Sequence, residues 1–118
     1  MNEQSAARMT GPSLEKMYQF LLWLMPTVEK FPRSHKFSLG ERIQNAALDI
    51  LEGLVEASYR RDRQALLVQV NMKLEKLRIL LRLATDLHCM DMRRYEFSAR
   101  ALDEIGRMVG GWIKTQRA

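Results

Sequence analysis

The sequence predicts an all-α protein, folded as an antiparallel up-down-up-down four-helix bundle. Apolar residues recur at intervals of three and four along four stretches, and no alternating pattern typical of a strand persists beyond a few residues. Only short segments separate the stretches, which favours antiparallel neighbours. The chain of 118 residues is one domain, long enough to bury a core without disulfides. We expect residues 1–12 to be a flexible tail and residues 13–118 to form the bundle.

The first helix is expected over residues 13–31. Ser13 is a suitable N-cap residue, and Pro26 predicts a kink in the helix. Pro32 ends the helix, because a residue that precedes a proline avoids the helical region. The expected core face consists of Leu14, Met17, Leu21, Leu24, Met25 and Val28, with Trp23 off the main stripe.

The second helix has the clearest start signal in the chain. Ser38 and Glu41 have the spacing of a capping box, in which each side chain accepts a hydrogen bond from the other residue's backbone N–H. The helix is expected to end near residues 59–61. Its expected core face consists of Leu39, Ile43, Ala46, Ile50, Leu54 and Ala57.

Two further helices are expected in the second half. Asp62 is the N-cap candidate of a helix that continues to about Leu87, with Leu66, Val70, Leu74, Leu77, Leu81 and Ala84 on its core face. The last helix begins after Asp91 and reaches about Gln116. Its core face is expected to consist of Leu102, Ile105, Met108, Val109 and Trp112.

Composition excludes several classes of protein. One cysteine allows no internal disulfide and no cysteine-based zinc site, and two distant histidines do not form a metal cluster. The sequence shows no nucleophile motif, no phosphate-binding glycine loop and no cofactor motif, so we expect no enzymatic activity, no metal and no cofactor. His88 and Cys89 are adjacent without a third partner, which argues against a catalytic pair. The start of the chain does not resemble a signal peptide and no apolar run is long enough to span a membrane, which favours the cytoplasm.

Apolar residues exceed what one bundle core requires. The third helix carries a second stripe, opposite its core face, and this stripe is the expected oligomer interface: Val68, Met72, Ile79 and Leu83. The second helix widens similarly through Leu48, Leu51 and Val55. The alternative is that the N-terminal tail or a broader internal core covers the stripe.

Positive charge is concentrated in the second half of the chain. Residues 1–59 have a net charge of −1 and residues 60–118 a net charge of +6, which favours an anionic partner. The expected nucleic-acid or partner-binding residues are a row on the last helix, Arg93, Arg100, Arg107 and Lys114, a cluster of Arg60, Arg61 and Arg63, and the pair Arg78 and Arg82. The alternative for the row is a solvated face, ion-paired with Glu96, Asp103 and Glu104.

A strip of small residues lies on the last helix. It consists of Ala99, Gly106 and Gly110, with Gly111 beside it. Because glycine inside a helix costs about 1 kcal/mol relative to alanine, the strip suggests close approach by another helix. Fraying near the end of the chain is the alternative.

Four stretches resemble a family of bacterial four-helix bundles. They are residues 24–26 (Leu-Met-Pro), 31–35 (Phe-Pro-Arg-Ser-His), 77–84 and 106–113. The family includes the accessory variability determinant (Avd) of diversity-generating retroelements and the proteins encoded in intervening sequences of 23S ribosomal RNA genes. The second branch typically has Ser-Ile-Pro and Asn-Ile-Ala-Glu-Gly in its second helix, whereas residues 48–56 retain only Glu-Gly. The run from Gly106 to Ile113 is more similar to the retroelement branch, which we favour.

The resemblance implies a fold, partners and a role. Members of the family form homopentameric barrels with basic surfaces, and the Avd branch binds its cognate reverse transcriptase and nucleic acid. It supports mutagenic retrohoming, in which the reverse transcriptase performs the catalysis. Arg78, Arg82 and Arg107 match basic positions of the family. We expect a homopentamer that binds reverse transcriptase and RNA or DNA, the latter with weak sequence specificity. The alternatives are a ribosomal-insertion protein of unknown role and a pure protein-interaction adaptor.

Overall fold

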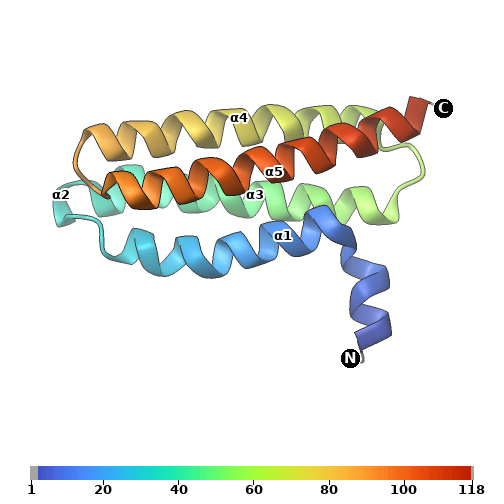
Figure 1. Ribbon diagram of the computed structural model, residues 1–118, viewed down its shortest axis with the longest axis horizontal. Helices are drawn as coiled ribbons and strands as arrows, with labels where there is room; N and C mark the ends of the chain where they lie inside the picture. The colour runs from blue at the N-terminus through green and yellow to red at the C-terminus, as the bar shows by residue number, and fades with distance from the viewer. Residues whose placement is uncertain (1–2, 118) are drawn as a thin grey trace.

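Four long helices form an antiparallel bundle. The computed structural model describes the backbone of residues 3–117 and the side chains of residues 11–116. Within these bounds the long helices are α1 (Glu3–Glu29), α3 (Glu41–Tyr59), α4 (Gln64–Asp86) and α5 (Met92–Arg117). The short helix α2 (Arg33–His35) and the π-helical turn η1 (Lys36–Gly40) join α1 to α3. The described backbone contains no strand, and its up-down-up-down path confirms the predicted all-α bundle (Figure 1).

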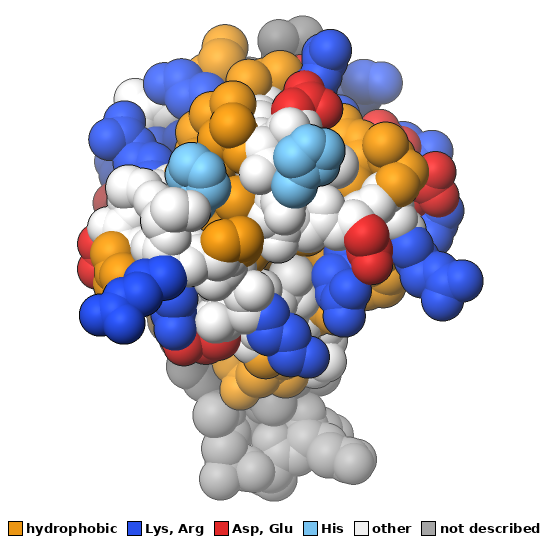
Figure 2. All heavy atoms as spheres, turned by 90° about the vertical axis from the view of Figure 1, so that its left-hand side faces the viewer, with side chains coloured by type: hydrophobic (Ala, Val, Ile, Leu, Met, Phe, Trp, Pro, Cys, Tyr) orange, Lys and Arg blue, Asp and Glu red, His pale blue; other side chains and the backbone are white. Residues whose placement is uncertain are grey.

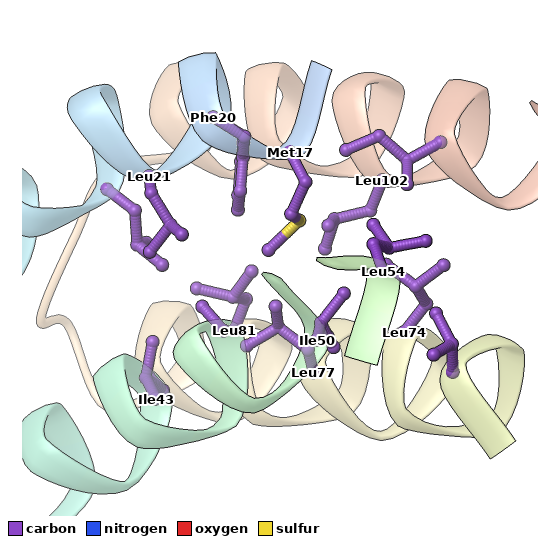
Figure 3. Close-up of a cluster of buried hydrophobic side chains, with 14 of the residues drawn as sticks. Met17, Phe20, Leu21, Ile43, Ile50, Leu54, Leu74, Leu77, Leu81 and Leu102 are labelled. Carbon is purple, nitrogen blue, oxygen red and sulfur yellow. The ribbon is translucent and has the colours of Figure 1, made fainter. Parts of the chain in front are cut away.

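Each long helix packs against two neighbours. α1 contacts α3 and α5, and α4 contacts the same two helices, so that α1 and α4 lie on one diagonal of the bundle. Figure 3 shows side chains from all four helices meeting on the bundle axis, among them Met17, Ile50, Leu77 and Leu102. Burying such apolar side chains is the main force that holds the helices together.

The first helix differs from the prediction at its N-cap and at Pro26. The backbone of Gly11 is non-helical, with φ 62° and ψ 170°, and α1 changes direction there (Figure 1). Ser13 is therefore not the N-cap residue: it lies inside the helical segment that follows Gly11, and Pro12 takes the first position, where a missing N–H costs nothing. Pro26 does not interrupt the helical backbone. The N-terminal boundary at residue 12 stays a prediction, and the side chains of residues 1–10 lie outside the described residues.

The predicted capping box at the start of α3 does not form. The Ser38 hydroxyl lies 3.4 Å from the carbonyl oxygen of His35, and no side chain caps the helix. The chain is already helical from Arg33 onward, so the N–H of Glu41 donates to the carbonyls of Lys36 and Ser38. Because backbone carbonyls satisfy this donor, the side-chain cap is unnecessary. The predicted end near residue 59 is confirmed.

The starts of α4 and α5 differ in how they are capped. Arg63 occupies the N-cap position of α4 without a side-chain hydrogen bond, so the prediction of Asp62 as the cap is wrong. Asp91 does cap α5: its Oδ1 accepts from the backbone N–H of Arg94 at 2.8 Å, and its Oδ2 lies 3.0 Å from Nη1 of the same arginine. This cap confirms the predicted start of the last helix.

Most predicted core positions are buried, and the exceptions lie on helix flanks. The pattern predicted Ala46 and Leu66 as core residues, but both are half-buried. Their neighbours Ala47 and Leu67 are buried instead. Four further positions predicted for the core are also half-buried, namely Met25, Leu39, Met108 and Trp112. Phe20 is buried although the pattern did not include it, because Trp23 packs beside it and against Phe97 of α5. None of the described helices combines the length and the apolar character that crossing a membrane requires.

Candidate functional site

The α4 stripe faces away from the bundle. Val68, Met72, Ile79 and Leu83 are 49%, 57%, 57% and 45% exposed, on the side of α4 opposite its buried residues. The bundle's own core therefore does not cover them, which contradicts the alternative of a broader internal core. An apolar stripe of this kind on a protein surface typically marks an interface.

A second exposed apolar group lies on α1 and α3 and was only partly predicted. Val55 is exposed, and Leu48 and Leu51 are half-buried, as the widened face of α3 suggested. Tyr18 and Leu22 of α1 are also exposed, and sequence reasoning missed them. Their spacing of four residues was the available signal, but it falls beside the core stripe of the same helix.

The basic row on α5 is exposed along its whole length. Arg93, Arg100, Arg107 and Lys114 all point into solvent. Arg107 lies 3.3 Å from Asp103. Among the described side chains the other three members make no ion pair within 4.0 Å. The ion-paired alternative therefore describes one member of the row, and three cations remain available to an anionic partner.

The acidic residues expected to neutralise the row contact other helices. Glu104 pairs with Lys16 of α1 at 2.9 Å. Asp103 lies between two arginines, 3.3 Å from Arg107 and 3.8 Å from Arg78 of α4. These carboxylates connect α5 to its neighbours and leave most of the row unpaired.

Arg78 is a structural residue in this chain. Its Nη2 donates to the backbone carbonyl of Leu102 at 3.1 Å, and Nη1 lies 3.6 Å from Glu75. A methyl group at Gly106 would approach Nη2 to 3.0 Å, so this glycine provides the space that the guanidinium occupies. Arg78 therefore connects α4 to α5. The Arg82 side chain, in contrast, is 69% exposed, and its ion pair with Asp86 has a separation of 4.0 Å.

The cluster at the turn between α3 and α4 does not form one cationic face. Arg60 pairs with Glu56 at 3.0 Å, and the half-buried Arg63 stacks its guanidinium over the Trp112 ring at 5.3 Å. Arg61 is exposed. Two of the three arginines thus have partners within the chain, and the cation–π contact fixes the turn against α5.

A groove between α3 and α4 contains cations that the sequence analysis did not single out. It encloses about 580 Å³ and is lined on its basic side by Arg42, Lys73 and Lys76. Ala46 and Leu80 form part of its apolar wall. Lys73 and Lys76 are three residues apart on α4, a spacing that could have placed these two cations on one flank of the helix.

The end of the bundle opposite the turn between α3 and α4 carries both histidines (Figure 2). His88 has a φ of 64°, and its N–H donates to the carbonyl of Thr85, while the N–H of Cys89 donates to that of Ala84. This pairing is a Schellman motif that closes α4, with histidine in the left-handed position. Burial raises the pKa of the Cys89 thiol, so the residue lacks the character of a nucleophile. Within the described part of the chain, no three His, Cys, Asp or Glu residues are placed to hold a metal ion.

The family of the chain follows from comparison with known proteins. The family model described as bAvd-like matches residues 13–116, which is nearly the whole bundle. No curated protein and no solved structure gives a significant match. The match includes all four stretches that carried the resemblance to the family of bacterial four-helix bundles. The chain belongs to the bAvd-like family.

Proposed function

We propose that the chain is a non-catalytic accessory protein of a diversity-generating retroelement, acting in the cytoplasm. As a homopentameric basic scaffold it binds the cognate reverse transcriptase together with template RNA or its cDNA, and so supports mutagenic retrohoming. Membership in the bAvd-like family supports the accessory role. The observation that carries the nucleic-acid part is the exposed row on α5, in which Arg93, Arg100 and Lys114 have no acidic partner among the described residues.

The row suits a phosphate backbone. Its members are seven residues apart, a spacing of about 10 Å along the helix, on one side of α5. Cations that contact phosphates release condensed counterions, which gives affinity without base recognition. Each chain has a formal charge of +5, and assembly multiplies this charge around a common axis. The scaffold would thereby hold RNA or cDNA near the polymerase, which performs the chemistry.

Salt-dependent binding of labelled single-stranded RNA tests the proposal. The row variant, Arg93→Gln/Arg100→Gln/Lys114→Gln, removes three unpaired cations. We expect the negative slope of log K against log [salt] to decrease in magnitude by about 2. The control variant, Lys30→Gln/Arg33→Gln/Arg42→Gln, loses the same charge at exposed positions near one end of the bundle. The control should bind RNA like the wild type, as measured by fluorescence anisotropy. Equal loss in both variants would mean that net charge, and not the row, determines binding.

Capture of the reverse transcriptase with the same two variants separates the two partners. If the row binds nucleic acid, the row variant should still capture the polymerase when RNA is removed by nuclease treatment. If the chain is a pure protein adaptor, the row variant should lose the polymerase and keep its affinity for free RNA. Salt-insensitive RNA binding by the wild type, or no binding at low salt, would contradict the nucleic-acid role.

A further inference from the structure

We propose that a pocket at the end of the bundle, where α1 bends at Gly11, binds a nucleoside monophosphate through the guanidinium of Arg63. The pocket encloses about 460 Å³ between the bend of α1, the end of α3 and the last turns of α5. It lies at the right-hand end of the bundle in Figure 1. A volume of this size is in the range of small-molecule sites in proteins. No member of the basic row on α5 lines the pocket, so the inference goes beyond the proposed function.

Arg63 gives the pocket its positive charge. Among the described residues no other charged side chain lines the pocket, so no carboxylate competes for the guanidinium there. Arg63 makes no ion pair within 4.0 Å with any described side chain, and its Nε is buried without a hydrogen-bond partner. A half-buried cation with an unsatisfied donor is unfavourable, and an oxyanion bound in the pocket would compensate it.

Trp112 holds this guanidinium in place before any ligand binds. The centre of its ring lies 5.3 Å from Cζ of Arg63, and the indole itself packs against the buried core. Because the long arginine side chain is already ordered, a ligand loses less affinity to the ordering of its binding site. The planar guanidinium presents several N–H groups, which suit the oxygens of a phosphomonoester.

Two hydroxyl groups of the pocket favour hydrogen-bond donors on the ligand. Ser58 donates its hydroxyl hydrogen to the carbonyl of Leu54 at 2.9 Å, and Thr115 donates its own to the carbonyl of Trp112 at 2.7 Å. The oxygens of these hydroxyl groups therefore remain as acceptors. A phosphate dianion cannot use them, whereas a sugar hydroxyl or an amino group of a base can.

The ligand that meets these conditions has three parts. One end carries an oxyanion for Arg63, the middle carries hydroxyl or amino donors, and a ring system contacts the apolar wall. This wall includes Pro12, Met108 and Trp112. A nucleoside monophosphate combines a phosphate, a ribose and a base in this order. Inorganic phosphate lacks the last two parts and a nucleoside lacks the first, so we expect both to bind more weakly.

Isothermal titration calorimetry with adenosine monophosphate, adenosine and inorganic phosphate as probes tests the site. The wild type should bind the monophosphate about tenfold more tightly than either fragment, because the fragments leave part of the pocket unpaired. Arg63→Gln should bind the monophosphate no better than adenosine. Arg33→Gln is the charge-matched control, since Arg33 is exposed at the opposite end of the bundle, and it should bind like the wild type. Circular dichroism should show wild-type helicity in both variants.

A second pair of variants leaves Arg63 intact. Gly111 lines the pocket and Gly110 does not, although a methyl group at either position would meet no described atom within 4 Å. Gly111→Leu should therefore fill the pocket and weaken binding of the monophosphate. Gly110→Leu has the same gain in helix propensity and should leave binding unchanged. Equal affinity of the two variants would mean that the nucleotide binds elsewhere, which would overturn the inference.

Competition in the row variant identifies the source of the monophosphate. If RNA with a terminal phosphate displaces the nucleotide and RNA with only terminal hydroxyl groups does not, the ligand is the end of a strand. If neither RNA displaces it, the ligand is a free nucleotide. Equal displacement by both, equal losses in Arg63→Gln and Arg33→Gln, or no binding to the wild type at millimolar monophosphate would overturn the inference. RNA binding by the row is decided by its own assay in every case, because the row lies outside the pocket.

Discussion

His88 shows how one residue can be kept in a conformation that its side chain disfavours. The Schellman motif at the end of α4 requires a left-handed residue, and in this chain a histidine with φ 64° fills the position that glycine usually takes. A side chain in this region costs about 1 kcal/mol. No glycine stands at this position to signal the motif, so the motif could not be predicted.

Replacing this histidine with glycine should stabilise the protein. We expect His88→Gly to raise the free energy of unfolding by about 1 kcal/mol, because the strain at the left-handed position disappears. Urea unfolding at one fixed protein concentration measures the change. Leu87→Gly is the control, since Leu87 has a φ of −86° and gains nothing from glycine. An unchanged or lower stability of His88→Gly would contradict the strain at this cap.

Two neighbouring arginines of α4 should differ in their contribution to stability. Arg78→Ala removes the hydrogen bond to the Leu102 carbonyl across the α4–α5 interface and should lower the free energy of unfolding by about 1–2 kcal/mol. Arg82→Ala is the matched control: its side chain is mostly exposed, so its loss should change stability by less than about 0.5 kcal/mol. Thermal unfolding of both variants measures the difference. Equal losses of stability in the two variants would mean that the hydrogen bond from Arg78 to Leu102 does not stabilise the α4–α5 interface.

The sequence predicted both arginines as binding residues, and it could not separate them. Arg78 and Arg82 are one turn apart, and both match basic positions of the family. Their difference arises from Leu102 and Asp103, more than 20 residues further along the chain. Such a long-range contact leaves no periodic signal, whereas the exposure of the row on α5 follows from its own helix and was predictable.

At the scale of the helices, two glycines with the same local conformation should respond in opposite ways to alanine. Gly53→Ala places a methyl group 2.8 Å from Val70 in the packed α3–α4 interface, which should outweigh the gain in helix propensity and destabilise the protein. Gly110→Ala meets no described atom within 4 Å and should stabilise the chain by about 1 kcal/mol. Chemical denaturation of the two variants tests both signs. Stabilisation by Gly53→Ala would show that Val70 moves aside freely.

The helices themselves were predictable because their signals are local. The end of α3 and the start of α5 match the prediction, since apolar periodicity and the Asp91 cap depend on neighbouring residues. The cap at Ser38 was wrong because the π-helical turn before Glu41 supplies backbone acceptors that no short motif reports. The small-residue strip on α5 is explained at Gly106, which makes room for Arg78, and not at Gly110 or Gly111.

At the scale of the whole molecule, the wild-type chain should assemble through the α4 stripe. Light scattering should give a mass near five times the 13.8 kDa of one chain. Leu83→Glu places a charge in the stripe and should reduce the mass to that of one chain while helicity is retained, because Leu83 is exposed in the bundle. Thr115→Glu is the control for the added charge and should leave the mass unchanged. A wild-type chain that is monomeric at micromolar concentration would contradict the assembly.

The sequence predicted that α4 has an apolar stripe left over, and helix periodicity was sufficient for this. It could not show the second exposed apolar group, because Tyr18 and Leu22 of α1 lie 26 to 37 positions before Leu48, Leu51 and Val55 of α3 and meet them only in the folded chain. Tyr18 and Leu22 could not be assigned to this surface from the sequence, because the contacts of Lys16 and Trp23 with α5 are what define the orientation of α1.

The even number of long helices determines where attached groups would emerge. The part of α1 that follows Gly11 begins at the same end of the bundle at which α5 ends (Figure 1). The segments around residues 30–40 and 87–91 lie at the other end. A fluorescent protein or affinity tag fused at either terminus would therefore emerge from the same end. The end with the two histidines would stay unobstructed, which makes it the side to present to an immobilised partner or an imaging surface.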